Sequence, residues 1–327
     1  MKKFIVFISL LLVVLSFNVY AQVDKVGQAG LGFLDVAAGA RSAGMGEAFT
    51  VLGQDPTALF YNPACMGEVE GNFALSAGGT QWIADINYYN LAGVYNAGVW
   101  GNLGFSVISP DYGEILGTRY DATDSAGYIE TGVYHPHAFC AGLAYAREFT
   151  DKFTVGLHVK YVSQHLGWNR KINGDDDTVA VQNEISALSY DFGLLFYPGF
   201  KSFAFGMSVR NFSPRIKYED FGFEMPLTFT LGVALDVMDF LGDYPDYSLN
   251  IAADGIHPRD WGEQYKVGAE FGYKDMIFLR AGWKFNVYKE GLTAGIGISY
   301  SGVKLDYSYS KHDLYDFINR ASVGFAF

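Results

Sequence analysis

The chain has little of three things: cysteine, charge and long apolar runs. Its 327 residues include two cysteines, Cys65 and Cys140, too few for a disulfide-stabilised scaffold. Charged residues make up 18%, and the formal net charge of −12 argues against a nucleic-acid partner. After residue 17 no apolar run reaches the roughly 18 residues of a membrane-spanning helix. No linker rich in proline or serine divides the chain, so one large domain is expected.

The first residues have the pattern of a secretory signal peptide. Lys2 and Lys3 give a basic start, residues 4–17 are almost wholly apolar, and small residues precede a cut after Ala21. A membrane anchor is the alternative, but this apolar run falls short of the roughly 20 residues that span a bilayer. Residues 1–21 are therefore expected to be removed on export, leaving a chain that starts near Gln22.

What the sequence has in excess is apolar and small residues. Half of the residues are hydrophobic, 17% are aromatic, and 39 are glycines. In an exported protein that lacks helical spans, this composition favours a transmembrane β-barrel, whose apolar residues face lipid instead of a large core. The bacterial outer membrane is then the expected location, and its lipid the first expected partner.

Alternation of apolar and polar residues dominates the chain after Asn72. In 152–164, for example, Phe153, Val155 and Leu157 alternate with small or polar residues. Glycine, serine and charge occupy the polar face, which suits a crowded lumen better than a surface in bulk water. Fourteen such segments are predicted, at 72–81, 84–96, 98–109, 136–149, 152–166, 185–197, 200–213, 225–238, 246–254, 262–273, 275–286, 292–300, 302–311 and 317–327.

The links between these segments alternate in length. Links at 97, 150–151, 198–199, 274 and 301 are tight, whereas those at 110–135, 167–184, 214–224 and 312–316 are longer. Outer-membrane barrels have short periplasmic turns and longer outer loops. The order predicts an antiparallel barrel of about 14 strands over 72–327 with both termini periplasmic. The alternating end of the chain, which closes on Phe327, resembles the terminal signal of outer-membrane proteins.

The segment 22–71 precedes the strands and does not alternate. A barrel of about 14 strands is wider than its own side chains can fill, so this segment is expected to plug the lumen. Its small residues allow close packing, and Asp55 before Pro56 predicts a capped helical turn that ends near Asn62. The plug motif comprises Arg41, Gly44, Met45, Gly46, Asp55, Pro56, Tyr61, Asn62 and Pro63.

This segment also carries a resemblance. The run FLDVAAGARSAGMGEAFTVLGQDPTALFYNPACM, from Phe33 to Met66, resembles the N-terminal signature of the PorV/PorQ family, a branch of the FadL-like outer-membrane barrels. LAYAREFTDKFTVGLHVKYV and the C-terminal LDYSYSKHDLYDFINRASVGFAF are similar to later parts of the family. The family pattern has glycine where this chain has Cys65, and a positive φ there would strain the cysteine.

The resemblance implies two different functions. PorV-like members are components of type IX secretion, which implies secreted cargo proteins and a surface-attachment sortase as partners. FadL-like relatives conduct hydrophobic small molecules such as fatty acids, with the plug as gate. The secretion role is the leading hypothesis and the transporter its alternative. A lateral gap and an apolar pocket would favour the transporter, whereas a sealed wall with large ordered outer loops would favour secretion.

Ten polar residues are expected to face the lumen. Their mixed signs favour mutual pairing that holds the plug to the wall, with Arg41 and Asp55 as plug partners, over an ion pathway of one sign. A polar conduit is the other interpretation. The ten are His158, Lys160, Asp191, Arg210, Lys266, Glu270, Arg280, Lys284, Lys304 and Asp306.

Other chemistry finds weak support in the sequence. No serine near His158 in sequence completes a hydrolase motif, so no enzyme activity is expected. His135 and His137 are too few for a metal site, and the acidic run 174–177 is read as a solvated loop rather than a calcium site. Cys65 and Cys140 could pair in an exported protein. No cofactor is expected.

Overall fold

A computed structural model describes residues 28–327 except 54, 70, 174–176, 218–221 and 243. The predicted signal peptide, the first residues of the predicted plug and most of the acidic run lie outside the described residues.

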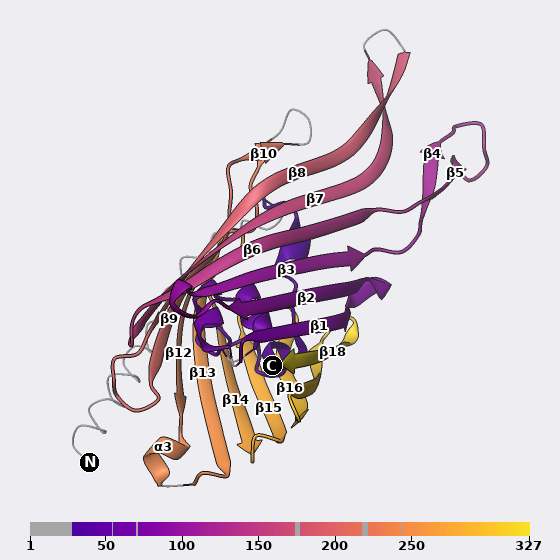
Figure 1. The fold of residues 1–327 in the computed structure, drawn as a ribbon. Coiled ribbons are helices and arrows are strands. Elements are labelled where there is room, and N and C mark those ends of the chain that lie inside the picture. Colours follow the sequence, from indigo (N-terminus) through magenta and orange to yellow (C-terminus); the bar gives the residue numbers. More distant parts are fainter. Residues whose placement is uncertain (1–27, 54, 70, 174–176, 218–221, 243) are drawn as a thin grey trace.

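In this part of the chain, fourteen antiparallel strands close into a barrel, which confirms the predicted fold class (Figure 1). The closing pair joins the first strand to the last in continuous register, from Ala74 opposite Ala326 to Gln81 opposite Asn319. In order around the barrel the strands are β1 (Phe73–Gln81), β2 (Asn87–Asn96), β3 (Asn102–Asp111), β6 (His137–Thr150), β7 (Phe153–Asn173), β8 (Asp177–Phe196), β9 (Ala204–Phe212), β12 (Thr228–Asp236), β13 (Tyr247–Pro258), β14 (Gln264–Tyr273), β15 (Ile277–Phe285), β16 (Glu290–Tyr300), β17 (Val303–His312) and β18 (Asp316–Ala326).

The sequence alternation corresponds to the two faces of the wall. Along β6, Leu143 is exposed on the outside while its neighbour Ala144 is buried on the inside. Leu231 and Leu305 are likewise exposed, on β12 and β17. Large apolar side chains thus cover the exterior, and small or polar side chains point inward.

The two ends of the barrel differ as predicted. At the short-turn end, β6 and β7 are joined by the turn of Asp151 and Lys152. The link predicted at Ala97 is a turn over 97–101 that contains η5 (Gly98–Trp100). A short helix, α3 (Met238–Leu241), lies in another link at that end. The long-loop end carries η4 (Ile83–Asp85) and two small hairpins, β4 (Ile115–Tyr120) with β5 (Tyr128–Tyr134) and β10 (Ile216–Lys217) with β11 (Gly222–Phe223).

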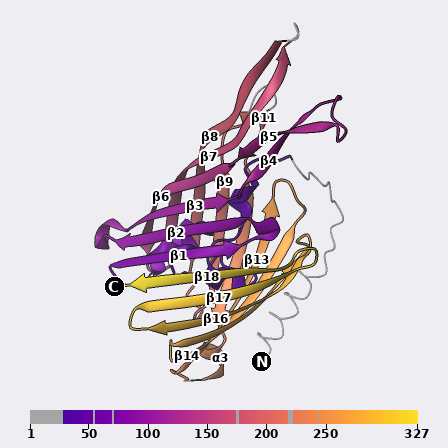
Figure 2. The same cartoon turned by 90° about the vertical axis from the view of Figure 1, so that its right-hand side faces the viewer.

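The loop predicted over 167–184 is mostly strand, which corrects that prediction. β7 and β8 continue past the barrel as a long hairpin, which projects from the long-loop end in both views (Figures 1 and 2). Gly167, read as the start of a loop, has φ +97° and lies where the register shifts between His165 and Trp168. It forms a bulge, after which cross-strand hydrogen bonding resumes.

The segment before β1 fills the lumen with short helical turns: η1 (Gly32–Asp35), α2 (Ala40–Gly44), η2 (Pro56–Phe60) and η3 (Pro63–Glu68) (Figure 1). Asp55 accepts the backbone N–H of Thr57 and begins η2, and Asn62 accepts that of Ala64 and begins η3. In each turn a proline follows the cap, where its missing N–H costs no hydrogen bond.

Cys65 lies inside η3, and it is not among the described non-glycine residues with positive φ. The strain expected from replacing the family's glycine is therefore absent at this position. The thiol is buried and lies 3.4 Å from the carbonyl oxygen of Thr50.

Glycines on the inner wall let the plug approach the strands closely. A Cβ added at Gly268 on β14 would lie closer than 3.0 Å to the backbone of Met45, and one at Gly282 on β15 equally close to that of Gly46. Gly46 itself has φ +64° and faces the backbone of both strands. The inward glycines predicted from alternation therefore form a surface on which the plug packs. Gly268 and Gly282 are the seat of the plug.

Candidate functional site in the plugged lumen

A first cluster of ion pairs joins α2 to the wall near the short-turn end. Arg41 donates from Nε and Nη2 to the two carboxylate oxygens of Glu270 on β14, at 2.9 and 2.7 Å. Glu270 also accepts from Arg280 on β15 at 2.5 Å, and Arg280 donates to Asp306 on β17 at 2.6 Å. All four side chains are buried, so removing one partner would leave an uncompensated charge.

A second cluster holds the turn after α2 nearer the long-loop end. Glu47 accepts from Lys266 at 2.7 Å and also from Lys284, which in turn donates to Glu290 at 2.6 Å. Burial raises the pKa of the Glu47 carboxyl, but the two lysines outweigh it and hold that pKa well below its usual value. Glu47 is therefore ionised, and the plug is attached to β14 and β15 at two levels.

Not every predicted plug residue pairs with the wall. The Asp55 carboxylate accepts hydrogen bonds from Thr57 N and Oγ1, both at 2.7 Å, and so caps η2. A charged residue of the lumen wall had been expected as its partner. The Tyr61 hydroxyl accepts from Ser42 and donates to the carbonyl of Ala38. These contacts are internal to the plug and fix its own shape.

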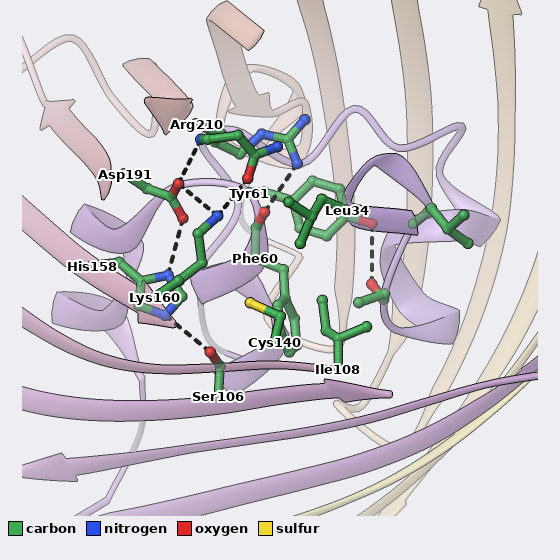
Figure 3. Close-up of a pocket in the computed structure, with 14 residues that line it drawn as sticks. Leu34, Phe60, Tyr61, Ser106, Ile108, Cys140, His158, Lys160, Asp191 and Arg210 are labelled. Atoms are coloured by element: carbon green, nitrogen blue, oxygen red, sulfur yellow. Dashed lines mark hydrogen bonds and ion pairs between the residues drawn. The ribbon is translucent and has the colours of Figure 1, made fainter. Parts of the chain in front are cut away.

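The third cluster lies on β3, β7 and β8, across the barrel from β14 and β15, and Figure 3 shows its side chains. His158 on β7 is hydrogen-bonded through Nδ1 to Asp191 on β8 at 3.0 Å and through Nε2 to Ser106 on β3 at 2.9 Å. Lys160 donates to Asp191 at 2.7 Å and to Asn211 at 2.6 Å. Ser106 was not among the residues predicted from the sequence, because nothing local in the sequence relates β3 to β7.

Two larger cavities lie on either side of the plug. One of about 400 Å³ opens at the long-loop end, and Trp82, Trp261 and Lys266 are among its lining residues. Another of about 300 Å³ lies at the short-turn end and is lined by Arg41, Lys304 and others. The Glu47 cluster lines the first cavity and the Arg41 cluster the second, so plug and ion pairs separate them.

A further cavity of about 20 Å³ lies beside His158, between plug and wall. Arg210 lines it and donates to the carbonyl of Phe60 at 3.0 Å, while Leu34 and Ile108 supply apolar surface (Figure 3). Apolar contacts continue from here toward the long-loop end. Their buried members are Leu31, Phe33, Leu34, Tyr88, Ala138, Cys140, Val162, Ile185, Ile216 and Met225.

Several solved structures share this architecture. The Ralstonia pickettii toluene transporter TbuX has a TM-score of 0.58 at 14% identity, over 88% of this chain and 97% of that one. The CymD monoaromatic hydrocarbon channel gives 0.59 at 11% identity over 91% and 99%. A Pseudomonas aeruginosa FadL homologue gives 0.52 at 11% identity over 89% and 98%.

This chain has their fold. At these identities the likeness establishes architecture alone, and it agrees with the FadL-like part of the resemblance. No protein-family model matches the chain, and no curated protein matches it by sequence. None of the described helices combines the length and the apolar character needed to cross a membrane.

The remaining sequence candidates form no site in the described residues. Cys65 and Cys140 are both free, because Cys65 packs within the plug near β8 and β9 while Cys140 belongs to the separate apolar cluster on β6. His137 stacks on His165 with ring centroids 4.9 Å apart. No group of three or more metal-ligating side chains is found in the described part of the chain.

Proposed function

We propose that the chain is an outer-membrane channel for a small hydrophobic molecule. The observation that carries this proposal is the apolar surface inside the lumen, since a barrel built only to pass water and ions has a polar interior. The shared fold with hydrocarbon transporters supports it. This reverses the order of the two hypotheses drawn from the sequence.

The exterior supports placement in the outer membrane. Leu143 is 73% exposed although it lies in the middle of a strand, and many other large apolar side chains face outward around the barrel. Such a surface requires lipid as its solvent. With the predicted export signal, the long-loop end faces the outside and the short-turn end the periplasm.

The contacts of the plug suggest which part gives way. Arg41 and Glu47 tie α2 and the following turn to β14 and β15 through directional, charge-assisted bonds. Leu31, Phe33 and Leu34 instead meet the opposite wall through apolar contacts. A hydrophobic ligand can replace such contacts because they have no fixed direction. In this proposal the ligand enters the 400 Å³ cavity and displaces the segment around Leu34.

The test is whole-cell uptake of radiolabelled toluene and of a long-chain fatty acid, in a bacterial host deleted for its own transporter. The wild-type chain should raise uptake above the empty host. Leu34→Asp places a polar group on the apolar route, and we expect it to lower uptake at least tenfold, because burying an unpaired polar group costs about 1–3 kcal/mol and a carboxylate costs more. Leu116→Asp, at an exposed position on β4, should leave uptake unchanged.

Equal uptake by wild type, Leu34→Asp and the empty host would count against a hydrophobic-molecule channel. Surface immunolabelling of each variant gives the amount of barrel in the membrane, so that low uptake is not mistaken for low expression.

A second function, a component of type IX secretion, is favoured by one observation. The described strands form a closed barrel, and the β7–β8 and β4–β5 hairpins project from its long-loop end (Figure 2). On the β4–β5 hairpin, Tyr120 is 80% exposed and Leu116 and Val133 are also exposed. Exposed apolar side chains on a projecting hairpin suit a protein-docking surface.

Purification of the tagged barrel from its native outer membrane in mild detergent tests this second function. We expect exported proteins with a common C-terminal domain, or a sortase-like surface protease, to co-purify. They should be lost when a Gly-Ser link replaces residues 115–134. A bare barrel from wild-type cells would contradict the secretion role.

A further inference from the structure

We propose that Ser106, His158 and Asp191 form an esterase site inside the lumen. This activity goes beyond the proposed transport function and differs from the non-enzymatic expectation drawn from the sequence. It rests on side chains that belong to three different strands, β3, β7 and β8, and that the channel proposal does not use.

The hydrogen bonds fix the direction of proton transfer. The Asp191 carboxylate can only accept, and its Oδ2 lies 3.0 Å from His158 Nδ1, so Nδ1 carries the proton. The neutral ring then offers Nε2 as an acceptor to the Ser106 hydroxyl at 2.9 Å. A serine, a base and a carboxylate that orients the base are the arrangement by which hydroxyl nucleophiles are activated.

The wall is shaped to let this contact form. Ser106 lies opposite Gly142 on β6, and Gly142 lies opposite Lys160 on β7, so the His158 ring must reach past β6. A Cβ at position 142 would lie closer than 3.0 Å to His158 Nε2. Glycine at this position therefore keeps the path from His158 to Ser106 open.

Asp191 is also held by two partners other than His158. Its Oδ1 accepts from Lys160 Nζ and from the backbone N–H of Asn211, both at 2.7 Å. Asn211 has φ +59°, where the β8–β9 register shifts between Tyr190 and Phe192. Bulges of this kind re-aim side chains and backbone groups and occur frequently beside active sites.

The cavity beside Ser106 indicates the class of substrate. Leu34, Val36 and Ile108 line it with apolar surface, which suits the aliphatic acyl chain of a carboxylic ester. Lys160 and Arg210 line the same cavity and supply positive charge for the oxyanion that develops on the carbonyl oxygen.

The reaction is an ordinary hydrolysis in two steps. Ser106 Oγ forms a bond to the ester carbonyl carbon, its proton moves to His158 Nε2, and the alcohol leaves with that proton. Water then attacks the acyl group on Ser106 with His158 again as base, which releases the carboxylic acid and restores the hydroxyl. Ester and water are consumed, and no oxidant, metal or cofactor is needed.

Access depends on the plug. A cavity of about 20 Å³ holds little more than one water molecule, which needs roughly 10–15 Å³. The plug residues Phe60 and Tyr61 line it (Figure 3), and Ala38 lines it as well. An ester can therefore enter only when this part of the plug shifts or is trimmed, and Phe60→Ala trims it while leaving the carbonyl that accepts from Arg210.

The experiment uses the full-length barrel in detergent, wild type and Phe60→Ala, treated with diisopropyl fluorophosphate and analysed by peptide mass spectrometry. Both chains carry Cys65→Ala, so that a small neutral maleimide reports access to the cavity through Cys140, which lines it. Ser189 is the control, because it is a buried lumen serine whose hydroxyl has no hydrogen-bond partner among the residues that the structure describes.

We expect the phosphoryl adduct on Ser106 of the Phe60→Ala barrel and not on Ser189. His158→Gln should slow its formation about 100-fold, the usual contribution of a general base. Asp191→Asn should slow it as well, and Asp191→Glu should recover part of the rate, which a merely structural role would not produce. Hydrolysis of p-nitrophenyl butyrate should follow the same order.

Three results would overturn the esterase site: no Ser106 adduct where Cys140 reacts, a Ser106 adduct that forms equally fast in His158→Gln, or a cavity closed to maleimide even in Phe60→Ala. Ser106→Ala should leave toluene and fatty-acid uptake unchanged. Failure of the esterase proposal is thereby separated from failure of the channel proposal.

Discussion

Gly282→Val is expected to unseat the plug and raise the single-channel conductance about tenfold, because an unfilled barrel of this strand number leaves an aqueous passage. The added Cβ would lie closer than 3.0 Å to the backbone of Met45 and Gly46. Backbone atoms cannot rotate away as a flexible side chain does, so the plug must move. Overpacking of this kind costs about 1–3 kcal/mol, and here the cost falls on the seat of the plug.

The measurement is conductance of the purified barrel in planar lipid bilayers, together with sensitivity of expressing cells to vancomycin. Gly255→Val is the control, since a Cβ there meets nothing nearer than 3.9 Å and the neighbouring Asp254 is the buried, inward residue. A Gly282→Val barrel with wild-type conductance would show that the plug does not depend on this contact.

Glu270→Leu is expected to lower the free energy of unfolding by about 3 kcal/mol, at the low end of the cost of breaking a buried ion pair. The substitution leaves Arg41 without its bidentate partner, while Arg280 keeps Asp306. The adjoining 300 Å³ cavity can hydrate part of the orphaned charge, which limits the loss.

Urea unfolding in lipid vesicles measures this effect, and the double variant Arg41→Met with Glu270→Leu, compared with each of the two single variants, tests its cause. Because the pair is then removed as a whole, the double variant should be more stable than Glu270→Leu and its loss smaller than the sum of the single losses. Asp313→Asn should cost less than about 1 kcal/mol, because the Lys311–Asp313 pair is exposed. Strictly additive losses would mean that Arg41 and Glu270 stabilise the plug independently.

The barrel could be predicted from the sequence because its determinants are local. A strand with lipid on one side and a crowded lumen on the other must alternate residue by residue. Leu143 can therefore be assigned to the outer face and Ala144 to the inner face without knowing which strands lie beside them. Tight turns such as the one at Asp151 are also local, and so are the caps formed by Asp55 and Asn62.

The largest misplaced segment depends on pairing with another strand. Glycine is common in loops, so Gly167 was read as the start of one. In the structure it lies at a bulge, and the pairing of β7 with β8 continues beyond it to Asn173. The hairpin that projects from the barrel was therefore hidden in a predicted loop.

The sequence by itself determined the strand number, the inside and outside of the strands that alternate most clearly and the presence of a separate N-terminal segment, since each of these follows from periodicity or composition. Only the tertiary structure decided which inward residues meet. Arg41 and Glu270 are 229 positions apart, and Ser106 and His158 are 52 apart. These contacts are determined by the closure of the barrel and by the stagger of hydrogen-bond register from strand to strand. That stagger is a property of many strand pairs together, so no single stretch of sequence contains it.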